Sequence, residues 1–116
     1  MNREIKGQDY RVVWLTEEST VVFHGILRLL GHKEYAPISD LLNEAAQHAT
    51  QITLDLQKLE FLNSAGINVV YRFIIQMRDD KVKRHVVVRG ANRVTWQEKS
   101  LQNLKRLMPD LQLEWD

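Results

Sequence analysis

The segment that joins a predicted strand to a predicted helix holds the residues best placed for chemistry. Residues 63–66 read Asn-Ser-Ala-Gly, and both Asn and Ser are favoured at helix N-caps. The unpaired amides of a first helical turn, together with the helix dipole, make such an end favourable for anions. Gly66 is a poor helix former, so its place in the first turn indicates that another backbone or a ligand comes close. These residues alone allow Ser64 to be either a helix cap or a functional hydroxyl.

Motifs of other chemistries are missing around this segment. A hydrolase nucleophile elbow has Gly two residues before and two residues after the serine, but Leu62 and Gly66 flank Ser64. The four histidines show neither HxH nor HExxH spacing and the chain has no cysteine, so we expect no metal site. No Walker A or GxGxxG pattern occurs, so we expect no cofactor. A small hydrolase or nucleotide-binding enzyme is therefore poorly supported.

The elements that position Ser64 follow from the spacing of apolar residues. Alternation and β-branched residues predict strands, and a period of about 3.6 residues predicts helices. Strands are expected at 10–15, 20–27, 51–56, 85–89 and 111–115, with 58–62 as a connector. Helices are expected at 37–49, where Pro37 suits a first turn, at 64–78, and from Thr95 to Pro109. Thr95 and Glu98 have the spacing of a capping box.

The order of these elements predicts the fold class. The order β-β-α-β-α-β-α-β is typical of an α/β fold with a mixed, mostly parallel sheet and covering helices. The two opening strands are expected to form an antiparallel hairpin. A chain of 116 residues has the size of one domain, so we assign residues 1–116 to a single domain. Function in such sheets lies beyond the carboxyl ends of the strands, which is where Ser64 is placed.

Composition restricts the class of protein and partner. Hydrophobic residues make up 44% and charged residues 27%, close to the average for soluble globular proteins. The net charge of +1 gives no argument for nucleic acid or a membrane surface. The longest apolar stretch, near 69–77, is too short to span a bilayer, and the amino terminus lacks the apolar region of a signal peptide. We therefore expect a cytoplasmic protein with no nucleic-acid partner and no membrane insertion.

The sequence around Ser64 resembles that of STAS domains, the family of sulphate transporters and anti-sigma factor antagonists. Residues 52–67 read ITLDLQKLEFLNSAGI, similar to the family pattern in which a strand with a central Asp leads into a helix bearing a regulatory serine. Residues 22–27 resemble the second strand of the family, and residues 86–94 resemble its fourth strand and the loop that follows. The resemblance therefore implies a STAS fold over nearly the whole chain.

The resemblance also implies a function. In the anti-sigma factor antagonist branch, which consists of bacterial signalling proteins, this serine is phosphorylated by an anti-sigma-type serine kinase and dephosphorylated by a PP2C-type phosphatase. The unmodified form binds the partner, and the phosphorylated form releases it. By position the phosphorylated residue is Ser64, in a module without catalytic activity. The residues expected to contact a partner are Asn63, Ala65, Gly66, Ile67, Gly25, Arg28, Gly90 and Arg93.

Two departures from the family pattern leave an alternative open. Asn63 stands where the family usually has Asp, and Arg28 stands near the place where many antagonists have an acidic residue. Loss of the carboxylate beside Ser64 could change phosphorylation or partner recognition. The alternative is a constitutive STAS subunit of a transporter or lipid-trafficking complex, without phosphorylation of Ser64.

Overall fold

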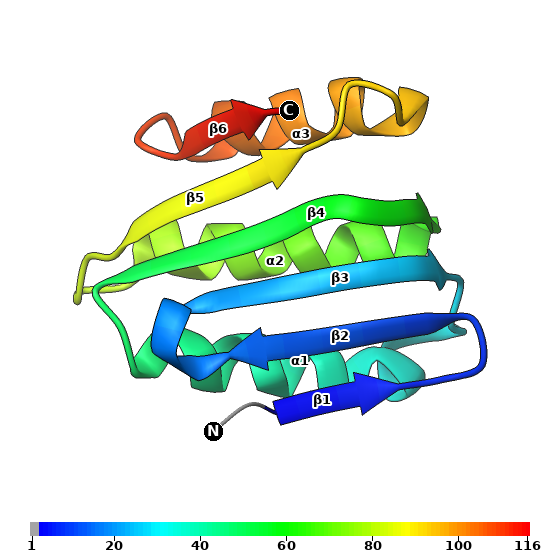
Figure 1. Cartoon of the computed structure of the whole chain (residues 1–116). Helices are drawn as coiled ribbons and strands as arrows, with labels where there is room; N and C mark the ends of the chain where they lie inside the picture. The colour runs from blue at the N-terminus through cyan, green and yellow to red at the C-terminus, as the bar shows by residue number, and fades with distance from the viewer. Residues whose placement is uncertain (1–2) are drawn as a thin grey trace.

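Six strands form one sheet whose spatial order follows their order in the chain (Figure 1). The computed structural model describes residues 3–116. The strands are β1 (Arg3–Lys6), β2 (Tyr10–Leu15), β3 (Thr20–Leu27), β4 (Gln51–Leu62), β5 (His85–Gly90) and β6 (Gln112–Trp115). The helices are α1 (Gly31–Gln47), α2 (Ser64–Asp79) and α3 (Thr95–Leu107), and a short 3₁₀ turn, η1, covers Thr16–Glu18. The predicted α/β fold with a mixed, mostly parallel sheet is confirmed.

All three helices lie on the same face of the sheet (Figure 1). The first two strand pairs are antiparallel, and the β3–β4, β4–β5 and β5–β6 pairs are parallel. Each parallel connection steps to the next strand in the same direction and carries one helix, so connections of one hand place every helix on one side. The parallel strands consequently share a carboxyl edge, and α1, α2 and α3 all begin there.

Three elements differ from the sequence prediction by more than two residues. Strand β1 was not predicted, because Arg3–Lys6 contains a single apolar residue and no alternation. Helix α1 begins at Gly31 rather than Pro37. The side chain of Tyr35 is buried, and this burial stabilises residues 31–36 as helix although most of them are polar. Strand β4 runs on to Leu62, so the residues expected as a connector are strand.

The far half of β4 extends beyond its partner β5. Strand β5 pairs only with residues 51–55 of β4, and beyond this the two strands diverge (Figure 1). Fully buried Gln97 of α3 replaces the missing ladder, because its Nε2 donates to the carbonyl oxygens of Leu56 at 2.6 Å and Leu59 at 3.1 Å. Its Oε1 accepts from the Ala91 amide at 2.8 Å. Gln97 therefore satisfies polar backbone groups that water cannot reach.

The capping box predicted at Thr95 is wrong. The N-cap of α3 is Val94, which makes no side-chain capping bond, and Thr95 is the first helical residue. Helix α3 begins one residue earlier than the capping box predicted, because the Gln97 amide donates to the Val94 carbonyl oxygen at 3.1 Å. The hydroxyl of Thr95 therefore stays exposed at the start of the helix.

Replacing Gln97 with Leu should lower the free energy of unfolding by about 2–4 kcal/mol, because two carbonyls and one amide lose their partner in a buried place. Urea unfolding followed by circular dichroism measures this difference. Gln102→Leu is the matched control, because Gln102 lies on the same helix and is exposed. Equal stability of the two variants would show that Gln97 does not hold β4.

Candidate functional site

The side chain of Asn63 joins three segments at the carboxyl edge of the sheet. Asn63 is the N-cap of α2, and its Oδ1 accepts from the Gly66 amide at 3.0 Å. The same oxygen accepts from the hydroxyl of Tyr35 on α1 at 2.7 Å. Its Nδ2 donates to the carbonyl oxygen of Leu29, in the loop before α1, at 2.9 Å. The first turn of α2 is therefore fixed to α1 and to the β3–α1 loop by one amide group.

Gly66 is required by packing against this network. A Cβ atom at Gly66 would lie 2.3 Å from Cδ1 of Leu62 and 2.6 Å from the hydroxyl oxygen of Tyr35. The close approach expected from the sequence is thus made by side chains of the chain itself. Tyr35 is 2% exposed, and burial raises the pKa of its phenol, so the hydroxyl stays protonated as a donor.

Tyr35 is the residue of this network that sequence reasoning missed. It lies in Gly31-His-Lys-Glu-Tyr, which has the polarity of a loop. Its spacing to Ile38, Leu42 and Ala45 continues the helical period of α1, and this signal could have placed it on the buried face.

Ser64 is the first residue of α2 and its side chain is exposed. Within residues 3–116, its hydroxyl has no hydrogen-bond partner. Because Asn63 is the cap, the interpretation of Ser64 as a capping residue is wrong. The amides of Ser64 and Ala65 belong to the first turn and have no acceptor within the helix, whereas the Gly66 amide is occupied. Ser64 therefore presents a free hydroxyl at the positive end of a helix dipole.

Arg28 and Gly25 lie at the end of β3 and beyond it, beside the β1–β2 turn. The Arg28 guanidinium is exposed and lies 3.5 Å from the Asp9 carboxylate. Gly25 has a φ of 86°, and a Cβ there would lie 2.2 Å from the Asp9 carbonyl oxygen. Gly25 thus permits close contact between β3 and the β1–β2 turn. Of the two residues predicted here to contact a partner, Arg28 is the exposed one.

Arg93 and Trp96 support the exposed end of β4. Arg93 donates to the Gln57 carbonyl oxygen at 2.9 Å and pairs with the Glu60 carboxylate at 3.2 Å. The indole of Trp96 donates to the Glu60 carbonyl oxygen at 2.9 Å. These bonds join the β5–α3 loop to the strand that leads into Ser64.

The other residues predicted to contact a partner divide into accessible and covered positions. Ala65 and Ile67 are half-buried beside Ser64 in the first turn of α2. Gly90 is buried, and a Cβ there would lie 2.6 Å from Leu101 and 2.7 Å from Trp115. The structure therefore brings Asn63, Ser64, Ala65 and Ile67 together, and contact with a partner stays a prediction for the whole set.

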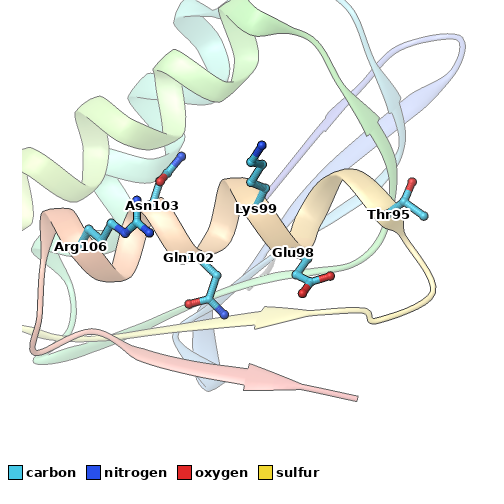
Figure 2. Close-up of a pocket in the computed structure, with 6 residues that line it drawn as sticks. All are labelled: Thr95, Glu98, Lys99, Gln102, Asn103 and Arg106. Carbon is cyan, nitrogen blue, oxygen red and sulfur yellow. The ribbon is translucent and has the colours of Figure 1, made fainter.

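One surface groove of the described residues is formed by α3 alone, away from Ser64. The groove in Figure 2 measures about 550 Å³, and its six lining residues all come from α3. Their side chains leave the helix in different directions, so they do not converge on one point (Figure 2). Within residues 3–116, no group of three His, Cys, Asp or Glu side chains could hold a metal ion. The described helices are also too short or too polar to cross a membrane.

A hydrolytic arrangement is not formed around Ser64. Within residues 3–116, no imidazole or carboxylate hydrogen-bonds its hydroxyl. His32, on the neighbouring helix, is bonded through Nδ1 to Arg72 at 3.0 Å. None of the described residues is therefore bonded to Ser64 as the base of a serine nucleophile would be.

Solved structures share this architecture over almost the whole chain. SiaC of Pseudomonas aeruginosa matches with a TM-score of 0.69 and 11% identity, over 99% of this chain and 95% of SiaC. A chain in the crystal structure of the diguanylate cyclase SiaD with its activator SiaC, from the same organism, matches with a TM-score of 0.72 and 9% identity, over 97% of each chain. An anti-sigma factor antagonist from Mycobacterium paratuberculosis matches with a TM-score of 0.59 and 16% identity, over 98% of this chain and 84% of that one. This chain has a STAS-like fold.

The resemblance predicted from residues 52–67 is thereby confirmed at the level of the fold. No protein-family model and no curated protein sequence matches the chain. Identities of 9–16% carry the fold and not the function, so the regulatory roles belong to the matched proteins.

Replacing Asn63 with Asp should lower the free energy of unfolding by about 1–3 kcal/mol. A carboxylate keeps the acceptor for Gly66 and Tyr35 but places an oxygen against the Leu29 carbonyl, where the amide now donates. Thermal and urea unfolding at neutral pH measure the change. Asn68→Asp, at an exposed position one turn along α2, is the control. An Asn63→Asp protein as stable as the control would show that the donor to Leu29 is dispensable.

Proposed function

We propose that this protein is a non-catalytic regulator of the anti-sigma factor antagonist type, which binds a partner protein through the start of α2. Phosphorylation of Ser64 controls this binding. The observation that carries the proposal is the exposed, unpartnered hydroxyl of Ser64 on a frame that Asn63 fixes independently. The hydroxyl takes no part in capping, so it can be modified without loss of a structural bond.

A phosphate on Ser64 would affect the docking of the partner rather than the fold. Phosphorylation adds a charge of about −1.5 to −2. The amides of Ser64 and Ala65 and the helix dipole stabilise an anion at this end of α2, so the fold tolerates the group. A partner that covers Ser64 would instead have to accommodate its bulk and remove its water, and this weakens binding. Phosphorylation therefore acts at the interface, while the sheet and helices stay as they are.

Two kinds of partner follow from the resemblance of residues 52–67 to anti-sigma factor antagonists. An anti-sigma-type serine kinase would add the phosphate and bind the bare form, and a PP2C-type phosphatase would remove it. SiaC, described as the activator of the diguanylate cyclase SiaD, extends the range of binding partners of this fold to a nucleotide-signalling enzyme. We place the protein in the cytoplasm, where such partners act.

Ser64→Asp should reduce partner binding by about tenfold or more, whereas Ser64→Ala should bind like the native chain. Quantitative mass spectrometry of proteins co-purified from the native cells measures binding. Thr95→Asp is the matched control, because Thr95 also begins a helix with an exposed hydroxyl at the same edge. All three variants should keep the native melting temperature to within a few degrees, because each helix start accommodates the change.

Equal recovery of a partner by Ser64→Ala and Ser64→Asp would contradict the switch. A stable complex that contains both variants, with Ser64 unmodified in the native protein, would support the constitutive-subunit alternative instead.

A further inference from the structure

Two large apolar side chains are exposed on the two segments that meet at Asn63. Leu30, the N-cap of α1, is 76% exposed, and Phe61, near the end of β4, is 46% exposed. Within residues 3–116 they share this property with Val82 alone, which is 62% exposed. Single exposed apolar residues are ordinary, but an apolar pair around one functional residue is typical of an interaction surface.

Phe61 precedes Asn63 by two residues, and Leu30 lies in the loop between β3 and α1. In the β3–β4 register, Phe61 lies opposite Ile26, so both extend the surface on the helix-free side of the sheet. Leu30 follows Leu29, whose carbonyl is bonded to the Asn63 side chain. Val82 lies in the α2–β5 connection, at the opposite end of the sheet (Figure 1). We refer to Ile26, Leu30 and Phe61 as the apolar patch.

Positive charge predominates around the apolar patch. Lys33, one turn after Leu30, and Lys58, on β4, are exposed and pair with no carboxylate among residues 3–116. The side chain of Arg28 is 66% exposed, and its contact with Asp9 is long at 3.5 Å. Glu34 is an exposed carboxylate of the same helical turn, and the carboxylate of Glu60, next to Phe61 in the chain, is neutralised by Arg93 at 3.2 Å. The amino end of α2 adds further positive potential. This surface therefore complements a partner segment in which apolar residues are flanked by carboxylates.

We propose that Leu30 and Phe61 anchor the partner, and that the partner segment seated on them is apolar with neighbouring Asp or Glu residues. This inference rests on the proposed function and gives the chemistry of its partner. A second copy of this chain fits less well, because a twofold contact would bring the same cations of both copies together. Ser64 lies beside the anchors, so its phosphate would be buried against apolar groups and would repel the partner's carboxylates.

Site-specific photo-cross-linking of the full chain in its own cells tests this inference. Benzoylphenylalanine is placed singly at position 30, 61 or 82, which are all exposed, and thermal melting verifies that each protein folds. We expect positions 30 and 61 to cross-link the same partner protein with a yield roughly tenfold or more above position 82. The cross-linked partner peptide should contain apolar residues and carry a net negative charge.

Each other outcome has a defined meaning. Cross-links to another copy of this chain, to a neutral or basic peptide, or equally from position 82 would overturn the inference. So would a co-purifying partner that cross-links at neither 30 nor 61. Cross-links that persist in Ser64→Asp would leave the docking surface in place and contradict the switch. A partner that depends on Ser64 but does not touch the apolar patch would leave the proposed function in place and contradict the inference.

Discussion

The amide group of Asn63 is the constraint on which the carboxyl edge of the sheet, the proposed functional edge, depends. One side chain accepts from the first turn of α2 and from Tyr35 of α1, and donates to the loop after β3. Gly66 allows this arrangement because any larger residue would overlap Leu62 and the Tyr35 hydroxyl. The departure from the Asp usual in STAS domains thus has a structural reason, since a carboxylate could not donate to Leu29. Ser64 is left free because its neighbour does all the capping.

A second set of contacts, made by side chains, stabilises the part of β4 that extends beyond β5 and leads to Ser64. Backbone pairing to β5 stops at Asp55, and side chains of Gln97, Arg93 and Trp96 then satisfy the carbonyls of the strand. Within residues 3–116, no buried side-chain polar atom lacks a hydrogen-bond partner. In this part of β4, polar side chains therefore satisfy the backbone carbonyls that a neighbouring strand satisfies elsewhere in the sheet.

The sequence predicted those parts of the structure that local patterns determine. The β-branched and aromatic residues in 10–15 and 20–27 predicted the bounds of β2 and β3, and the apolar period predicted the start of α2 at Ser64. Strand β1 has no such pattern. The helical period could place Tyr35 on a buried face, but it could not show that Tyr35 bonds Asn63, 28 residues away. Nor could spacing show that Gln97 bonds Leu56 and Leu59, 41 and 38 residues away. For the site, the residue types at 63–66 predicted the start of the helix, and the helix dipole predicted that this end favours anions. It did not show that Asn63, and not Ser64, is the cap, because both residue types cap helices.

Together these features describe a frame in which the Ser64 hydroxyl is exposed and makes no structural bond, so the proposed phosphorylation would change the surface and not the fold. Phosphosite mapping by mass spectrometry, on the protein isolated from its own cells in growth and under stress, tests this account most directly. The account predicts phosphate on Ser64 whose occupancy changes between the two conditions. A Ser64 that is unmodified in both conditions, in a protein that stays bound to its partner throughout, would contradict it.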